Sequence, residues 1–245
     1  MKATIYQGHR PRLPHADVNI VIDVVRAFTV AHYAFLRGAR EIILAGTEGE
    51  AFLLKEKNPD FLLAGEVQGL PIAGFNFDNS PARMACADVG GSTLVQKTTN
   101  GVKAALNALD ADAVFVTGFS NARTTAECVL ELWPLGSVVN IIASHPDGDD
   151  DLACAEYIKG ILNGKETISA EAVAERIRRS VPARKFFDPS RPEFQAEDIA
   201  FCTRELAGGF VMHVDCTRKF PTIVRVNNDE LYRIGPSGKR SEAEV

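Results

Sequence analysis

Short apolar runs alternate with helical segments along most of this chain, and this alternation constrains its fold more than any other feature. The runs are rich in Val, Ile and Leu, as in buried strands of a parallel sheet. They cover residues 19–25, 41–45, 61–64, 92–97, 113–117 and 138–143. Helical patterns lie between and after them, at residues 27–37, 49–57, 102–109 and 122–132, and from the acidic turn 147–151 through residue 162. The alternation predicts an α/β fold of three layers (α/β/α), with a largely parallel mixed sheet and helices on both faces.

Two segments, 34–46 (AFLRGAREIILAG) and 106–118 (LNALDADAVFVTG), show a weak internal similarity. Each contains a helix end, a turn of small residues, an apolar strand and a glycine. This internal similarity suggests two similar halves with a site in the cleft between them. The length suits one large domain or two small ones, and we expect a single domain over residues 1–245, with 1–90 and 91–235 as candidate subdomains. The polar tail 236–245 is expected to fray.

The carboxy-terminal third breaks the alternation. A helix is expected over residues 170–180, followed by a basic linker over 183–190 and a second helix over 193–207. The runs 210–215 and 222–234 look like strands. The sequence Asn-Asn-Asp at 227–229 suggests that the second run is a hairpin.

The composition indicates a globular protein. With 46% hydrophobic residues and a net charge of −5, the chain shows no electrostatic footprint for nucleic acid or an anionic membrane. No apolar run approaches the roughly 20 residues that span a bilayer, and the first residues lack the apolar region of a secretory signal. The five cysteines form no CxxC pair, so each is expected to be a small buried residue in a reducing compartment. We expect a cytoplasmic protein, and many cytoplasmic α/β enzymes of this size are homodimers.

The stretch 65–81, GEVQGLPIAGFNFDNSP, follows an apolar run and is expected to be a shaped loop. Its glycines and prolines prevent a regular helix. Ligands of parallel α/β sheets collect beyond the carboxyl ends of the strands, which makes this polar loop a candidate site. A turn in which Asp78 or Asn79 bonds its own backbone before Pro81 explains the stretch equally well.

Polar residues stand at four points where a predicted strand ends. They are Asp23 and Arg26, then Glu66 and Asp78, then Thr98, Thr99, Asn100 and Gly101, and finally Ser120 and Asn121. If the sheet is parallel through these strands, the four groups lie at one edge. The last two groups would then stand at helix amino termini, which bind anionic oxygens such as those of phosphate.

Three carboxylates and one arginine complete this candidate site. Arg26 offers a planar fork for phosphate or carboxylate. Asp23, Glu66 and Asp78 are hard oxygen ligands of the kind that magnesium takes together with substrate oxygens and water. Together with the helix termini, these groups describe a metal-assisted phosphoryl site.

Simpler interpretations exist for several of these residues. Thr98 or Thr99, taken alone, is best explained as an N-cap. Asp23 and Arg26 are also explained as a local ion pair, which contributes little if it is exposed. The acidic run 147–151 resembles a metal loop but is better explained as a helix start that the helix dipole favours.

Missing motifs exclude several enzyme classes. The chain has no GxxxxGK[ST] loop, no GxGxxG after a strand and no GxSxG elbow, which argues against P-loop, Rossmann and common hydrolase sites. Asp23 is followed by two valines and so departs from the DxD-type phosphatase motif. His145, at a strand end, is the histidine to follow, although a surface position is the better expectation. Cys154 is expected in the core.

Six short motifs occur in a fixed order: DVVRA (23–27), AGE (64–66), FDNSP (77–81), TTNG (98–101), GFSNA (118–122) and DDLACAEYI (150–158). In this order they resemble the 2-phosphosulfolactate phosphatase family. The resemblance covers roughly residues 19–162. The order of the six is more specific than any one motif.

The resemblance implies a magnesium-dependent phosphatase of coenzyme M biosynthesis, built as an α/β/α sandwich of two similar subdomains. It would hydrolyse 2-phospho-3-sulfolactate to 3-sulfolactate and inorganic phosphate. Carried over position by position, the expected catalytic residues are Asp23, Arg26 and Glu66, and the expected magnesium site is Asp23, Glu66 and Asp78. The small phosphorylated and sulfonated substrate would be bound, on the motifs and the junctions together, by Asn79, Ser80, Thr98, Thr99, Asn100, Gly101, Ser120 and Asn121.

Two positions depart from the family pattern and bear on the exact substrate. Phe28 stands where a small hydroxyl residue is common, and we expect it to narrow the pocket. Glu156 stands where glycine is frequent, and it faces either the cleft, near a dianionic substrate, or solvent. The alternative functions are a phosphatase for another 2-hydroxy-acid phosphate ester and a non-catalytic anion-binding module.

Overall fold

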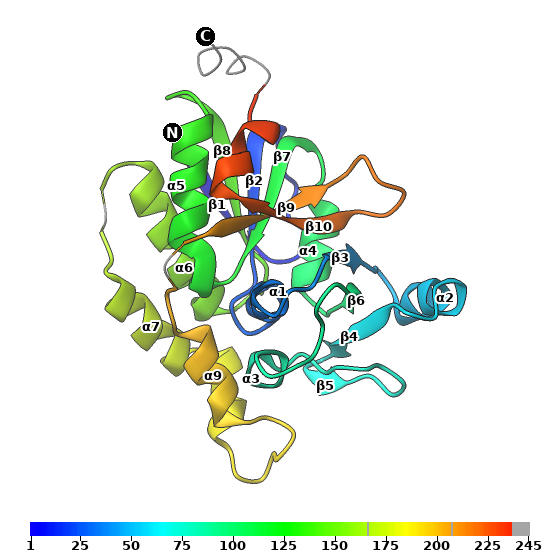
Figure 1. Ribbon diagram of the computed structural model, residues 1–245. Helices are drawn as coiled ribbons and strands as arrows, with labels where there is room; N and C mark the ends of the chain where they lie inside the picture. Colours follow the sequence, from blue (N-terminus) through cyan, green and yellow to red (C-terminus); the bar gives the residue numbers. More distant parts are fainter. Residues whose placement is uncertain (166, 207, 237–245) are drawn as a thin grey trace.

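The computed structural model describes residues 1–165, 167–206 and 208–236. The strands among them are β1 (Lys2–Gln7), β2 (Ala16–Ile22), β3 (Glu41–Leu44), β4 (Leu62–Val67), β5 (Leu70–Pro71), β6 (Thr93–Lys97), β7 (Ala111–Thr117), β8 (Val138–Ala143), β9 (Phe210–Asp215) and β10 (Thr222–Asn227). They form one sheet in the order β1-β8-β2-β7-β9-β10-β3-β6-β4-β5 (Figure 1).

Helices cover this sheet (Figure 1). The α-helices are α1 (Ala27–Leu36), α2 (Glu48–Lys57), α3 (Pro81–Met84), α4 (Gly101–Asn107), α5 (Ala122–Leu132), α6 (Asp149–Leu162), α7 (Ala170–Arg179), α8 (Val181–Arg184) and α9 (Ala196–Cys202). Three 3₁₀ helices are η1 (Phe119–Asn121), η2 (Lys185–Phe187) and η3 (Asn228–Arg233). No helix in the described parts of the chain is long and apolar enough to cross a membrane.

The sheet contains two parallel sets of strands. β1, β8, β2 and β7 pair in parallel, and so do β3, β6 and β4. Between the sets, β9 and β10 pair antiparallel with each other and with their outer neighbours β7 and β3. These three antiparallel steps make β3 run opposite to β7. The predicted α/β fold with a largely parallel mixed sheet is confirmed, whereas the division into subdomains stays a prediction.

The two faces of the sheet bury different side chains, as alternation along a strand requires. Ile20 and Ile22 of β2 enter a core shared with α5, α6 and α7. Val21 between them enters a second core with α1 and α4. Every residue of α1 from Ala27 to Phe35 is buried, which is typical of a helix enclosed on all sides. Helices on both faces give the predicted three layers.

Several expected boundaries shift. The strand expected at 19–25 is Ala16–Ile22, so Asp23 stands just beyond its end. The helix expected at 193–207 is shorter, at Ala196–Cys202. The expected hairpin at 227–229 is wrong, because Asn228 begins η3. The predicted tail, from residue 237 onward, lies outside the described residues.

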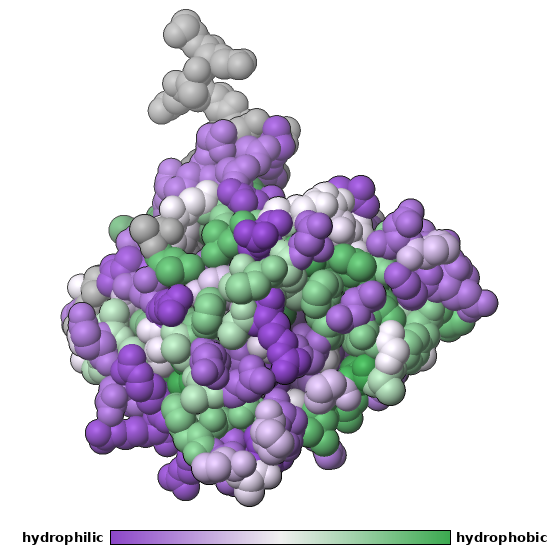
Figure 2. All heavy atoms as spheres, turned by 60° about the horizontal axis from the view of Figure 1, so that its bottom comes forward, coloured by the Kyte–Doolittle hydropathy of each residue, from purple (hydrophilic) through white to green (hydrophobic). Residues whose placement is uncertain are grey.

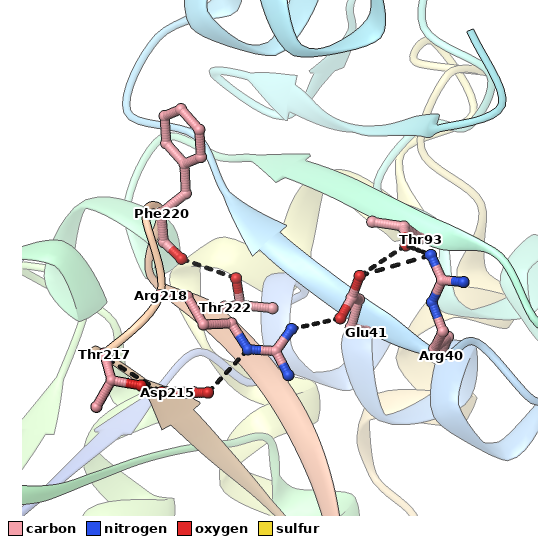
Figure 3. Close-up of polar contacts among 8 residues, drawn as sticks. All are labelled: Arg40, Glu41, Thr93, Asp215, Thr217, Arg218, Phe220 and Thr222. Atoms are coloured by element: carbon pink, nitrogen blue, oxygen red, sulfur yellow. Dashed lines mark hydrogen bonds and ion pairs between the residues drawn. The ribbon is translucent and has the colours of Figure 1, made fainter. Parts of the chain in front are cut away.

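The true hairpin joins β9 to β10, and its turn is tied to the sheet by Arg218. This side chain donates to Asp215 at the end of β9 and to Glu41 at the start of β3 (Figure 3). Glu41 also accepts the hydroxyl of Thr93 on β6. These contacts link the antiparallel strands to the second parallel set.

The cysteines differ from expectation in part. Cys128, Cys154 and Cys202 are buried, as predicted, but Cys86 and Cys216 are exposed. The two exposed cysteines lie outside regular helices and strands, where alternation and helical periodicity give no guide to burial.

Candidate active site

The ends of β2, β4 and β6 meet at one place, although β2 runs opposite to β4 and β6. A methyl group added to Gly101, at the start of α4, would lie 2.5 Å from Asp23 Oδ2. Glycine is therefore required for this close approach. Glu66 at the end of β4 accepts the Thr99 hydroxyl at 2.9 Å. Three of the four predicted junctions, those after β2, β4 and β6, thus lie close together. They meet because strands of opposite direction end towards one another, and not because they end at one edge of the sheet as predicted.

A cavity of about 220 Å³ opens at this point. Its lining includes six of the predicted site residues: Asp23, Arg26, Glu66, Asn79, Thr99 and Asn100. The other lining residues are Val25, Gln68, Gly69, His145, Pro182, Lys185 and Phe186. Asn79 is buried, and its Oδ1 has no hydrogen-bond partner among the described residues. We take this cavity as the candidate active site.

Glu66 is held by a tight turn. Gln68 and Gly69 have positive φ angles of 53° and 86° and join β4 to β5 as a two-residue hairpin turn. The turn brings the Gly69 amide to Glu66 Oε2, and the Thr99 amide donates to Oε1. The start of the stretch 65–81 is therefore strand and hairpin rather than loop. Both oxygens of Glu66 already accept hydrogen bonds from the protein.

A second group of carboxylates is buried beside the cavity. It consists of Asp23 after β2 and of Asp150 and Asp151 in the first turn of α6. Asp151 accepts the amides of Val24, at 2.7 Å, and His145, at 2.9 Å. Asp150 Oδ1 has no hydrogen-bond partner among the described residues.

Burial raises the pKa of all three carboxylates. Desolvation, followed by the neighbouring carboxylate of Asp151, raises the pKa of Asp23 to about 8. Desolvation, followed by Asp23, raises the pKa of Asp150 to about 7. Desolvation, followed by Asp150, raises the pKa of Asp151 to about 8. Like charges that share a dry site disfavour ionisation, and no Lys or Arg of the described residues forms an ion pair with this acidic trio.

The acidic trio provides the fit test for magnesium, a cation that usually takes one or two carboxylates plus substrate oxygens and water. Asp23 lines the cavity. Asp150 does not line it, but its charge interacts with that of Asp23, and its Oδ1 has no hydrogen-bond partner among the described residues. These two fit magnesium best. In the described parts of the chain, no group of three or more His, Cys, Asp or Glu side chains is arranged to hold a metal. The donor set therefore suits a cation that completes its shell with substrate and water.

The predicted trio of ligands is arranged differently. Asp78 does not line the cavity and pairs with Arg83 at 2.8 Å. Glu66 lines the cavity, but its oxygens are occupied by Thr99 and Gly69. Asp23 lines the cavity, its Oδ1 accepts the Ala27 amide at 2.8 Å, and its Oδ2 accepts the Ser144 hydroxyl at the longer distance of 3.4 Å, so Asp23 is the predicted ligand best placed for a cation.

Arg26 lines the cavity and is firmly held. Nη1 donates to Asp198 Oδ2 at 2.7 Å, and Nη2 donates to Gly69 O at 3.1 Å. Its guanidinium carbon lies 4.8 Å from the centre of the Phe186 ring. Arg26 thus pairs with Asp198 of α9 and not with Asp23. Two side-chain atoms, Arg26 Nη1 and Ser80 Oγ, converge on the buried Asp198 carboxylate.

The remaining predicted residues lie around or away from the cavity. Thr98 lies two residues before Asn100, the N-cap of α4, and its hydroxyl accepts the Val102 amide of the first turn at 2.9 Å. Ser80 caps α3 by accepting the Arg83 amide. Ser120 and Asn121 line a different cavity of about 130 Å³. The structure therefore does not bring the fourth junction to the other three.

Phe28 and Glu156, the departures from the family pattern, do not line the cavity. Phe28 is fully buried in the core between α1 and the sheet. Glu156 faces outward and pairs with Arg176 of α7, which also binds Asp149. The expectation that Phe28 narrows the pocket is wrong, and Glu156 takes the solvent side of its two alternatives.

Sequence reasoning missed several residues at the site. Asp150 and Asp151 belong to the motif DDLACAEYI. Because the helix dipole alone explains an acidic run at a helix start, the sequence did not identify them as site residues. His145 lines the cavity, contrary to the preferred surface position. Lys185 and Phe186 come from the segment that was expected to be a linker. Asp198 gave no signal, because only the packing of α9 brings it to Arg26.

Comparisons with known proteins agree with the six motifs. The model of the family described as 2-phosphosulpholactate phosphatase matches residues 5–215. A probable 2-phosphosulfolactate phosphatase of Bacillus subtilis is 57% identical over 226 residues, which cover 92% of this chain and 99% of that protein. A protein of the same name from Carboxydothermus hydrogenoformans is 33% identical over 197 residues, or 76% of this chain and 81% of its own.

Proposed function

Because the chain belongs to the 2-phosphosulfolactate phosphatase family, we propose that it hydrolyses 2-phospho-3-sulfolactate to 3-sulfolactate and inorganic phosphate. Family membership makes it a phosphoric monoester hydrolase. The observation that carries the proposal is the cavity that Asp23 of the acidic trio lines together with Arg26 and Lys185. Such a site pairs anionic oxygens with fixed cations and leaves room for a divalent metal.

Magnesium is part of the proposal, with Asp23 and Asp150 as its protein ligands. When bound there, it would polarise the phosphoryl oxygens and offset the charge of the acidic trio. Arg26 would bind a phosphoryl oxygen through N–H groups not used for Asp198 and Gly69. The ion pair and the aromatic ring beneath Arg26 keep this fork in place, so binding requires little reorganisation.

His145 can hold a proton at the cavity. Its Nδ1 accepts the Asp147 amide at 3.1 Å, so the neutral ring carries its proton on Nε2. Burial is the main cause that lowers the pKa of His145, which favours this neutral form at pH 7. In hydrolysis an oxygen of water bonds to phosphorus while the bond between phosphorus and the ester oxygen breaks, and the water supplies the proton that the ester oxygen takes up. Neutral His145 would donate a hydrogen bond through Nε2–H to that departing oxygen.

The proposal also covers the kind of substrate, the cellular location and the pathway. The substrate would be a small anion, the protein would act in the cytoplasm, and the reaction would belong to coenzyme M biosynthesis. The absence of nucleic-acid and membrane partners and the homodimeric state stay predictions from the sequence.

The test is phosphate release by the purified protein from 2-phosphosulfolactate and from 2-phospholactate, each with magnesium and with a chelator. We expect magnesium-dependent release from the sulfonated ester that exceeds release from phospholactate. Equal release from both esters would assign a broader hydroxy-acid phosphatase. No release from either ester would contradict the proposal.

A further inference from the structure

The segment 181–187, which overlaps the expected linker 183–190, forms one wall of the cavity. α8 and η2 contribute Pro182, Lys185 and Phe186 to its lining. Ala183 and Phe186 are buried in a small core with Phe194 and Ile199. This wall is therefore a packed element of the fold. On the face that carries α3, α9 and β5, hydrophilic side chains interrupt the apolar ones (Figure 2).

Lys185 and Arg26 share the same aromatic surroundings. The Lys185 ammonium lies 4.5 Å from the centre of the Phe194 ring and 5.7 Å from that of Phe186. The Arg26 guanidinium lies 5.8 Å and 4.8 Å from these two centres. Both cations also flank Gly69: Arg26 donates to its carbonyl, and a methyl group added to Gly69 would lie 2.8 Å from Lys185 Nζ.

The two cations differ in their partners. Arg26 is neutralised by Asp198, whereas Lys185 forms no hydrogen bond or ion pair with the residues that the structure describes. Burial, followed by the nearby charge of Arg26, lowers the pKa of Lys185, whereas the charges of Glu66 and Asp150 act in the opposite direction. A half-buried ammonium beside another cation is unfavourable unless an anion compensates it. Neither carboxylate forms a hydrogen bond or an ion pair with Lys185, so its ammonium is available to a further anion in the cavity.

We propose that Lys185 forms a second anion subsite, which binds the sulfonate of the substrate while Arg26 binds the phosphoryl group. This inference rests on the proposed function and adds the residue that selects the sulfonated substrate. An ammonium is a compact point charge with three donors, which suits the three oxygens of a tetrahedral sulfonate. A planar carboxylate matches a guanidinium fork better. Pro182 and Phe186, beside Lys185 in the lining, would contact the methylene that carries the sulfonate.

The test compares Lys185→Met with the wild type on 2-phosphosulfolactate and 2-phospholactate. Loss of one charge-assisted contact predicts a fall of about 10- to 100-fold in kcat/KM for the sulfonated ester, mainly through KM. For phospholactate we expect a change below about twofold. Lys185→Arg should retain most of the discrimination. The matched control is Arg184→Met, which removes an exposed charge from the same segment and should leave both values unchanged.

Calorimetric binding of 3-sulfolactate and lactate to the same proteins separates this inference from the proposed function. We expect the wild type to prefer 3-sulfolactate by at least about tenfold, and Lys185→Met to lose this preference. If the wild type shows the preference but hydrolyses neither ester, the subsite stands and the proposed function fails. Equal losses for both ligands, or a preference that survives in Lys185→Met, would overturn the inference. Circular dichroism checks that each variant is folded.

Discussion

Two groups of carboxylates meet near the cavity, and the fold treats them differently. Glu66 accepts three hydrogen bonds, from the amides of Gly69 and Thr99 and from the Thr99 hydroxyl. The acidic trio of Asp23, Asp150 and Asp151 has raised pKa values, because burial and mutual repulsion raise each pKa by more than the hydrogen-bond donors lower it. Asp151 also accepts three hydrogen bonds, from the amides of Val24 and His145 and from the Ser144 hydroxyl. The two groups therefore differ in how many carboxylates are buried together and not in the number of donors. Perturbed pKa values of this kind cluster at functional sites, and on that ground we expect the acidic trio to hold the cation.

The largest expected effect comes from the acidic trio. Asp23→Asn should lower magnesium-dependent kcat by at least about 100-fold, because it removes a charge aimed at the reacting group. The fold should survive, since the change also removes a buried, uncompensated carboxylate. Phosphate release and a thermal melt in chelator measure the two effects. Unchanged activity in a folded Asp23→Asn protein would exclude Asp23 from the active site.

Glu66→Gln is the matched comparison from the other group. The NH2 group of the new side chain would replace one carboxylate oxygen. At least one N–H or O–H group that now donates to Glu66 would then face another donor. We expect a loss of about 1–3 kcal/mol in the free energy of unfolding, with magnesium affinity largely kept. If Glu66→Gln instead abolishes magnesium binding and leaves stability intact, the contrast between the two groups is wrong.

A smaller effect should appear in the pH dependence of stability. In the metal-free protein, Asp23 and Asp151 have pKa values of about 8, against an ordinary value of 3.8. Between these values the native state binds more protons than the unfolded state, so stability falls as pH rises from about 4 to 8. Magnesium binds the ionised carboxylates, so its stabilisation should grow over the same range.

Thermal melts at pH 5.5 and 8.5, with chelator and with magnesium, check this expectation. Each kcal/mol lost should lower the melting temperature by about 2–4 °C, and magnesium should restore more at the higher pH. Asp151→Asn should flatten the dependence measured in chelator. A magnesium effect of equal size at both pH values would contradict a site built on the acidic trio.

The sequence allowed prediction of the strands and helices that have a clear period, and of the junction residues that follow them. Asp23, Thr99 and Gly101 were predicted because strand ends and helix starts are local features. The opposite direction of the two parallel sets was not predictable, because it depends on β9 and β10, strands near the end of the chain. Asn228 illustrates the same limit. Its preference for turns is local, but tertiary packing decided between a hairpin and a 3₁₀ helix.

The missed site residues share one cause. Lys185 lies in the expected linker and Asp198 in an expected helix, and long-range packing against Arg26 gives both their place. Asp150 and Asp151 were visible as an acidic run, but a helix start explains such a run without any ligand. Their burial beside Asp23 separates the two explanations, and burial is a property of the folded chain.

The smallest expected effect concerns Asp78, which the sequence grouped with Asp23 as a metal ligand. In the structure it pairs with Arg83, a half-exposed side chain, away from the cavity lining. Asp78→Asn should therefore change kcat/KM for 2-phosphosulfolactate by less than about twofold and the free energy of unfolding by about 0.2–1 kcal/mol. Arg83→Gln, which breaks the same pair from the other side, should match it in both measurements. Asp78 Oδ1 also accepts the Ser80 amide at 3.3 Å, a bond that the asparagine oxygen can keep. A large loss of activity in Asp78→Asn alone, with the free energy of unfolding unchanged, would therefore return Asp78 to the metal site.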